Sequence, residues 1–188
     1  MRQYNFQVLD NIISQEEADY YEMLTLGRCN GRYMLPVINY KPKWEPTAKG
    51  ESESIPLSFW HPLKDDLVTG SEHLEIFLSP LIEFCKIKSF PLRELLNARI
   101  FITQPLDDKE RKHFSPHTDM PHLERWLSAI YYVNDANGPT YFFRDDGTIL
   151  TKVEPKKGRL VAFDGTIKHG GGIPTNGYRC IINYNFIA

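Results

Sequence analysis

His117 and Asp119 form an H-x-D sequence in the second half of the chain. Residues i and i+2 of a β-strand point to the same face of a sheet, so on a strand this imidazole and this carboxylate could reach one ion together. Both side chains are common ligands of transition metals. A histidine on a half-buried strand is also often purely structural, so the pair alone does not define a site.

Two residues farther along the chain strengthen the metal interpretation. His169 stands at the predicted end of a strand, directly before three glycines, and Arg179 begins the last predicted strand. Two histidines and one carboxylate on one face of a metal form the facial triad of non-haem iron oxygenases, which leaves coordination positions open. The planar guanidinium of Arg179 would suit a carboxylate held nearby. The alternative for Arg179 is an exposed or ordinarily ion-paired strand residue.

The elements around these residues are predicted to be short strands. Apolar runs rich in Ile, Val, Tyr and Phe alternate with turn residues from residue 97 onward. Many short strands with regular turns are typical of a β-sandwich or barrel. We expect strands at 98–103, 126–133, 140–143, 148–153, 159–163 and 178–186.

The first half of the chain predicts helices. Ser14 followed by Glu17 is a capping box for a helix that reaches Leu26 and stops at Gly27. Apolar spacing predicts a second helix over residues 71–86. Helices that precede strands in a chain suggest helices packed outside the sheets.

Two further segments are assigned from composition and local pattern. A short third helix is expected at 91–96. Residues 28–62 hold five prolines and a polar stretch, so we expect an irregular loop, either a flexible insertion or a lid.

Length, charge and composition set the broad class. A chain of 188 residues fits one domain, expected to span 1–188 with helical support in 1–96 and a barrel core in 97–188. A net charge of -2 argues against capture of nucleic acid by the whole surface. Three scattered cysteines and the lack of a long apolar run predict a cytoplasmic protein that does not contact a membrane.

These residues resemble the 2-oxoglutarate/Fe(II)-dependent dioxygenase superfamily, and the sequence around them is similar to its prolyl 4-hydroxylase-like branch. The resemblance covers residues 97–186. It is carried by His117, Asp119, His169 and Arg179, and by three segments: His113-Phe-Ser-Pro-His-Thr-Asp119, Leu127-Ser-Ala-Ile-Tyr-Tyr-Val-Asn134 and Val153-Glu-Pro-Lys-Lys-Gly-Arg-Leu-Val-Ala-Phe163.

The resemblance implies a mainly β fold with α support: a double-stranded β-helix, or jelly-roll and cupin-like barrel, with the N-terminal helices outside. It implies that His117, Asp119 and His169 bind Fe(II), and that 2-oxoglutarate chelates the iron and extends its distal carboxylate to Arg179. With O2, its decarboxylation to succinate and CO2 would be coupled to hydroxylation of a C–H bond. Ascorbate is a further candidate cofactor.

The resemblance also suggests weaker assignments near the cosubstrate. Tyr132 corresponds to a tyrosine that helps bind the distal carboxylate in this branch, with Tyr131 as the alternative because adjacent strand residues face opposite ways. Either could simply be a core aromatic. Gln104 or Thr103, at the end of the first barrel strand, is a candidate cosubstrate contact. Asn183 shares the strand face of Arg179 and could contact a ligand or only satisfy the backbone.

The substrate stays open at this point. A peptidyl or free proline is favoured, with recognition by loops 28–62, 105–113 and 120–126. Two other classes are a nucleic-acid demethylase or repair enzyme, for which nucleic-acid binding is disfavoured by the net charge, and a non-enzymatic cupin-like module that binds a small molecule. The nucleic-acid class depends on a basic cluster of Lys152, Lys156, Lys157 and Arg159.

Overall fold

The structure is a computed structural model, and it describes residues 5–29, 32–33, 36–43, 58–65, 70–106 and 112–188. Residues 30–31, 34–35 and 44–57 of the expected loop 28–62, and residues 107–111 of the expected loop 105–113, lie outside the described residues. The elements in chain order are β1 (Phe6–Leu9), α1 (Gln15–Leu26), β2 (Arg28–Cys29), β3 (Arg32–Tyr33), β4 (Lys41–Lys43), β5 (Ser58–Lys64), the 3-10 helix η1 (Glu75–Phe77), α2 (Ser79–Lys88), β6 (Glu94–Thr103), β7 (Leu127–Tyr132), β8 (Thr140–Phe143), β9 (Ile149–Val153), β10 (Leu160–Asp164), β11 (His169–Gly171) and β12 (Arg179–Ile187).

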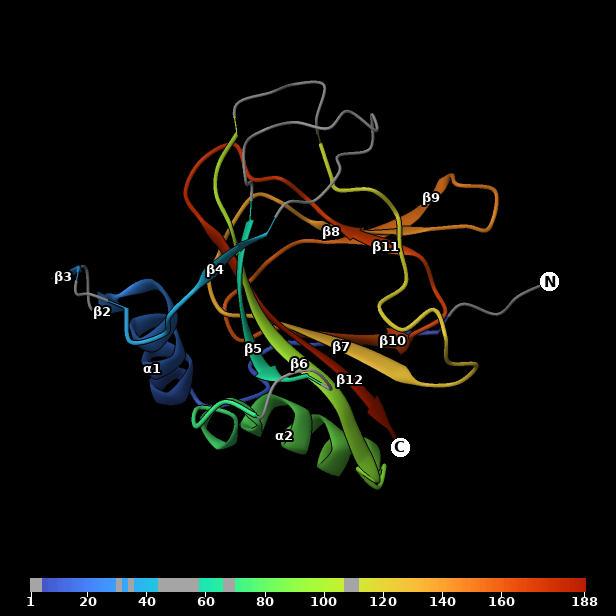
Figure 1. Cartoon of the computed structure of the whole chain (residues 1–188), viewed down its shortest axis with the longest axis horizontal. Helices are drawn as coiled ribbons and strands as arrows, with labels where there is room; N and C mark the ends of the chain where they lie inside the picture. Colours follow the sequence, from blue (N-terminus) through green and yellow to red (C-terminus); the bar gives the residue numbers. More distant parts are fainter. Residues whose placement is uncertain (1–4, 30–31, 34–35, 44–57, 66–69, 107–111) are drawn as a thin grey trace.

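Two antiparallel sheets form the body of the molecule (Figure 1). The larger has the order β1-β10-β7-β12-β6-β5-β4, and the smaller has the order β11-β8-β9. An apolar cluster that includes Ile130, Phe142, Phe163 and Ile181 fills the space between them. The rings of Phe142 and Phe163 meet edge to face, 4.8 Å between centroids. The predicted mainly β fold of the double-stranded β-helix class is confirmed.

The helices cover the other face of the large sheet (Figure 1). Tyr21 of α1 and Phe84 of α2 are buried in one core with Ile100 of β6 and Tyr184 of β12. Side chains alternate along each strand, so one face of β6 and β12 packs on the helices and the other faces the small sheet. That second face carries the candidate site.

The first predicted helix is confirmed with its caps. Ser14 Oγ accepts a hydrogen bond from the backbone N–H of Glu17 over 3.2 Å. Gly27 ends the helix in a left-handed conformation, φ 66°, and donates its backbone N–H to the carbonyl of Met23. A left-handed C-terminal residue favours glycine because no Cβ clashes there.

Three other element predictions need correction. Residues 91–96 are not a helix, because β6 begins at Glu94 and pairs with β12. Cross-strand pairing overrides a local helix pattern of this length. The second helix begins late, at Ser79, after a 3-10 turn, with Pro80 in its first turn. The expected loop 28–62 also contains the strands β2, β3 and β4, and its residues 58–62 belong to β5, whose register shifts between Pro62 and Lys64. A bulge accommodates a proline, which cannot donate to the ladder.

The strand predictions for the second half lie close to the observed elements. Residues 140–143 coincide with β8. The other predicted strands agree with the observed bounds to within one residue, except that β6 begins at Glu94, four residues before the predicted strand 98–103. The short β1 and β11 were not predicted, since four and three residues carry too little pattern. Within the described part of the chain, no helix has the length and apolar character needed to cross a membrane.

Candidate metal centre

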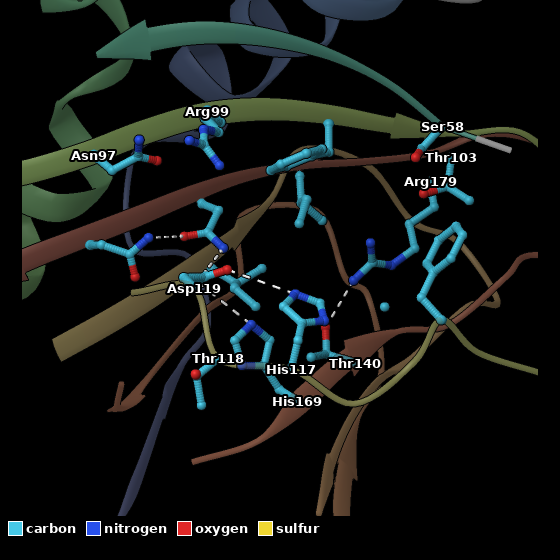
Figure 2. A pocket seen from close by; sticks show the side chains of 17 residues that line it. Ser58, Asn97, Arg99, Thr103, His117, Thr118, Asp119, Thr140, His169 and Arg179 are labelled. Atoms are coloured by element: carbon cyan, nitrogen blue, oxygen red, sulfur yellow. Dashed lines mark hydrogen bonds and ion pairs between the residues drawn. The ribbon is translucent and has the colours of Figure 1, made fainter. Parts of the chain in front are cut away.

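His117, Asp119 and His169 lie together at the edge of the small sheet. His117 and Asp119 lie in the segment before β7, which is not a regular strand. Instead His117 forms an isolated bridge with His169, in which each backbone N–H donates to the other residue's carbonyl, at 3.0 and 2.9 Å. The bridge brings the two imidazoles to one side. One ligand atom from each of the three residues lies within 4.8 Å of the others (Figure 2).

Both imidazoles present the same nitrogen to the carboxylate. His117 Nδ1 lies 2.9 Å from the Ser115 carbonyl, and His169 Nδ1 lies 3.2 Å from the Ile167 carbonyl. A carbonyl only accepts, so each Nδ1 carries the hydrogen and each Nε2 keeps its lone pair when the ring is neutral. The Nε2 atoms lie 3.8 Å and 3.6 Å from Asp119 oxygens. Two lone pairs and a carboxylate that face one another are the donor set of a divalent cation.

Burial and neighbouring charges shift the pKa values of Asp119 and His169. Burial opposes ionisation of Asp119, but His169, His117 and a hydrogen bond from Asn183 outweigh it and lower the pKa of this carboxyl. Burial lowers the pKa of His169, although Asp119 partly offsets this. An ionised carboxylate beside a neutral imidazole is the protonation state that metal binding needs. His117 is half exposed, with 46% of its side chain accessible, so the three ligand-type residues are open to solvent on the side of His117.

A buried chain of hydrogen bonds holds Asp119. Asn183 Nδ2 donates to Asp119 Oδ2 over 3.0 Å, and Asn185 Nδ2 donates to Asn183 Oδ1 over 3.3 Å. Ser128 Oγ donates to Asn185 Oδ1 over 2.6 Å, and Trp126 Nε1 donates to Ser128 Oγ over 3.1 Å. All four supporting side chains are buried.

The indole of Trp126 sets the direction of donation along this series of hydrogen bonds. An indole N–H can only donate, so the Ser128 hydroxyl accepts from Trp126 and turns its own hydrogen to Asn185. Each amide then accepts on its oxygen and donates from its nitrogen. The last group in this series of hydrogen bonds must accept one, and an ionised Asp119 carboxylate does so.

Arg179 lies at the other end of the same cavity, and it is 2% exposed. Its Nε donates to the Gly138 carbonyl over 2.7 Å, and its Nη2 donates to Thr140 Oγ1 over 2.8 Å. Tyr132 lies behind this pair: its ring is 5.8 Å from the guanidinium carbon, and its hydroxyl donates to Thr140 Oγ1 over 2.7 Å. Burial of such a charge is costly unless an anion or several acceptors face it.

Ser58 supplies a hydroxyl beside Arg179. Arg179 on β12 pairs with Thr103 on β6, and Thr103 pairs with Ser58 on β5, so the three residues form one row across the sheet (Figure 2). All three line the cavity. Ser58 Oγ is buried and has no hydrogen-bond partner among the described residues. An orphaned hydroxyl next to a buried guanidinium fits the carboxylate of a bound ligand.

The cavity that joins these groups has a volume of ≈ 230 Å³. Its wall from the large sheet is polar at both ends, with Phe101 and Ile181 between them. Phe114 also contributes to the lining. The arrangement can hold a metal beside a small dicarboxylate, with apolar groups that keep water away from the centre.

Of the other predicted site residues, some line the cavity and some do not. Asn183 lines the cavity, as do Thr103 and the three ligand-type residues. Tyr132 is fully buried and reaches the site through Thr140. Tyr131 faces the helices and packs on Tyr21, and neither it nor Gln104 lines the cavity.

The sequence did not point to six polar residues that line the cavity: Ser58, Asn97, Arg99, Thr118, Thr140 and Asn185. Asn185 and Arg99 follow from the alternation of β12 and β6 once those strands are paired. Ser58 has no local signal, because its place depends on pairing with Thr103, which follows it by 45 residues in the chain.

The barrel region is similar in sequence to one known family. Residues 103–187 match the model of the 2OG-Fe(II) oxygenase superfamily. No curated protein sequence matches the chain significantly.

Solved structures share the fold over nearly the whole chain. A prolyl-4-hydroxylase from Pseudomonas putida has a TM-score of 0.59 at 14% identity, covering 98% of this chain and 92% of that one. A 2OG-Fe(II) oxygenase family oxidoreductase from Burkholderia pseudomallei has a TM-score of 0.69 at 12% identity, covering 96% and 84%. A prolyl hydroxylase from Trichoplax adhaerens, in complex with a hypoxia inducible factor peptide fragment, has a TM-score of 0.62 at 14% identity, covering 97% and 83%. Identities this low show likeness of fold alone.

Proposed function

We propose that the chain is a hydroxylase of the 2OG-Fe(II) oxygenase superfamily, whose family model residues 103–187 match, and that its Fe(II) is bound by His117, Asp119 and His169. The overall reaction converts 2-oxoglutarate, O2 and a substrate C–H bond into succinate, CO2 and an alcohol. One oxygen atom of O2 enters succinate and the other enters the alcohol. The observation that supports the metal assignment most is the approach of three ligand atoms within 4.8 Å, with both Nδ1 atoms bonded to backbone carbonyls.

Bound Fe(II) and 2-oxoglutarate would supply the activation of O2. The chain's own residues would do the rest. Asn183 and the hydrogen bonds behind it orient Asp119. Arg179 would pair with the distal carboxylate of 2-oxoglutarate, while Thr140 holds the guanidinium in place. Phe101 and Ile181 would exclude water beside the metal.

Ser58 and Thr103 would extend the carboxylate site of Arg179. The Ser58 hydroxyl would gain the partner that it lacks among the described residues. A hydrogen bond to a charged group contributes about 1.5–3 kcal/mol, more than one between neutral groups. Tyr132 would act behind Thr140 and not by direct contact with the cosubstrate.

An anaerobic titration tests the proposal. Protein loaded with Fe(II) should develop a weak metal-to-ligand absorption in the visible range when 2-oxoglutarate is added. His169→Ala should lose both the metal and the band, because a buried ligand is removed. Exposed His122→Ala is the matched control and should keep both. A fully loaded wild-type protein without the band would contradict the cosubstrate assignment.

We favour a prolyl or proline-like substrate, because two of the similar structures are prolyl hydroxylases by their names. Succinate formation in the presence of proline-containing peptides or free proline measures this. Ascorbate would act only as a reductant that restores Fe(II), and its effect should disappear when Fe(II) is replenished.

The nucleic-acid class has little support from the surface. Lys152 pairs with Glu154 over 2.7 Å, and Lys156 pairs with Asp10 over 3.0 Å. Lys157 pairs with Asp19 and Glu22, and Arg159 pairs with Asp10. A basic cluster whose charges are matched by carboxylates offers little attraction to phosphates.

A further inference from the structure

A second arginine lines the end of the cavity opposite Arg179. Arg99 lies on β6 four residues before Thr103, and both side chains line the cavity (Figure 2). A strand rises about 3.3 Å per residue, so the two positions are roughly 13 Å apart along the wall. Arg99 pairs across the sheet with Asn183, the residue that contacts Asp119. The cavity therefore continues past the metal-type ligands, away from the carboxylate site of Arg179.

Arg99 is held in place on its outer edge. Its Nη2 and Nε both donate to Asp65 Oδ2, at 2.6 and 3.2 Å, and its guanidinium carbon lies 5.4 Å from the centre of the Trp60 ring. Nη1 makes no hydrogen bond to any described residue, and 32% of the side chain is exposed. A guanidinium fixed by a carboxylate on one edge and an aromatic face beneath keeps its other edge for a ligand.

The surroundings of Arg99 are donors and amides, not an apolar pocket. Asn97 and Asn185 line the same end and are buried. The amide nitrogens of Asn183 and Asn185 are already committed to Asp119 and Asn183. Arg99 is therefore the cation that a ligand at this end would meet first.

We propose that Arg99 binds the carboxylate of a free small-molecule substrate, such as a free amino acid, so that a carbon of that molecule lies next to the metal. The proposal rests on the proposed function of the site. A carboxylate offers two oxygens to a guanidinium edge, and such charge-assisted bonds are about twice as strong as those to a neutral peptide carbonyl. A cavity of ≈ 230 Å³ shared with 2-oxoglutarate also means that only a small part of any substrate can be enclosed beside the metal ligands.

A binding experiment separates free acids from peptides. The protein is loaded with Zn(II), which does not turn over, and with 2-oxoglutarate. A panel of free L-amino acids, their carboxamides and proline-containing peptides is titrated by calorimetry. We expect at least one free acid to bind, and its carboxamide to bind at least tenfold more weakly. Equal affinity for the two, binding of peptides alone, or binding of none of these probes would overturn the proposal.

Substitutions then assign the contact. Arg99→Gln should lower the affinity for the acid at least tenfold and bring it to that of the carboxamide, and Arg99→Lys should recover part of the difference. The matched control is Arg144→Gln, at an exposed turn after β8, which should change neither affinity. If Arg99→Gln unfolds because the ion pair with Asp65 is lost, the Arg99→Lys variant and the ratio of acid to carboxamide affinity in the wild type still test the proposal. An unchanged ratio in a folded Arg99 variant would overturn the assignment.

The visible band of wild-type protein with Fe(II) and 2-oxoglutarate is recorded in parallel, without substrate. Its absence would contradict the proposed function. Its presence together with equal binding of acid and carboxamide would contradict only the role of Arg99.

Discussion

Asn183 Nδ2 donates to Asp119 Oδ2 over 3.0 Å, and this bond connects the carboxylate of the candidate metal centre to Trp126 through two further buried side chains. A carboxylate on an irregular segment has no strand ladder to orient it. The large sheet does so instead, because Asn183 and Asn185 lie on β12 and Ser128 lies on β7. The position of Asp119 is thus set by β12 and β7, two paired strands of the large sheet.

Asn183→Ala should weaken metal binding about 10- to 100-fold, the usual effect of removing a side chain that orients a ligand. Asp119 loses its donor, and the amide nitrogen of Asn185 loses its acceptor. The test is the Mn(II) dissociation constant from electron paramagnetic resonance. Asn137→Ala is the control, since Asn137 makes its hydrogen bonds to Thr175 at the surface. Equal Mn(II) affinity in Asn183→Ala and wild type would mean that Asn183 does not position the ligand.

Ser58→Ala should change two measurements in opposite directions. Its buried hydroxyl has no partner among the described residues, so its removal should leave the free energy of unfolding of ligand-free protein unchanged or higher. The same change should weaken 2-oxoglutarate binding about 10-fold, because a hydrogen bond to a carboxylate is lost. Urea unfolding and calorimetry measure the two effects. A loss of stability with unaltered 2-oxoglutarate affinity would show a structural hydroxyl only.

The sequence points to the ligand-type residues of this site better than to the residues that line the rest of the cavity. The H-x-D sequence, His169 and Arg179 stand out by residue type, and the fold brings all four to one cavity. Their neighbours depend on pairing between distant strands. Ser58 reaches the site because β5 pairs with β6, and residue type gives no warning of that.

The same limit applies to secondary structure. Local signals predict α1, whose caps lie within the segment itself. Local signals fail for residues 91–96. Their sequence pattern is helical, but hydrogen bonds to β12 hold residues 94–96 in the extended conformation of β6. Tyr131 and Tyr132 show the same limit for single residues. Strand alternation predicts that the two side chains face opposite ways, but the order of the strands in the sheet is needed to know which one faces the small sheet.

Arg179→Gln should raise the 2-oxoglutarate dissociation constant by about 100-fold or more and leave Mn(II) affinity close to wild type. The amide keeps hydrogen-bonding capacity but removes the charge that would face the distal carboxylate. The neighbouring bonds to Gly138 and Thr140 are also weakened, so thermal unfolding is measured alongside. Unaltered 2-oxoglutarate affinity in folded Arg179→Gln would place the carboxylate elsewhere.

Asp10 links the start of the chain to the barrel and should contribute to acid stability. A bidentate hydrogen bond from Arg159, and another from Lys156, lower the pKa of Asp10 from 3.8 to about 2. A carboxyl with a lowered pKa stabilises the folded state above its unfolded pKa, and this contribution is lost as the pH falls from about 4 to 2.

The carboxyl of Asp10 is 36% exposed, so solvent screening limits the contribution to about 1 kcal/mol at most. Asp10→Asn should therefore lower stability slightly at pH 7 and flatten the loss between pH 4 and 2. Urea unfolding of both proteins across that range measures the difference. Parallel pH curves would show that the Asp10 pairs contribute nothing to folding.

Gly165→Ala should disturb the metal centre from a distance. A Cβ at residue 165 would lie 1.9 Å from Nε1 and 2.1 Å from Cε2 of Trp126, and a buried indole cannot bend away as a flexible side chain could. The ring must shift, which costs about 1–3 kcal/mol and breaks its bond to Ser128. With the indole displaced, the Ser128 hydroxyl can reverse its hydrogen and Asn185 loses its fixed orientation.

We therefore expect Gly165→Ala to combine lower stability with weaker Mn(II) binding and a red-shifted tryptophan emission. Gly147→Ala is the matched control for a glycine-to-alanine change at a surface turn: a Cβ at Gly147 has open space, although its φ of 83° brings backbone strain. Gly147→Ala should lower stability without altering Mn(II) affinity or emission. If Gly165→Ala changed stability alone, the hydrogen bonds that begin at Trp126 would support the fold but not the orientation of Asp119.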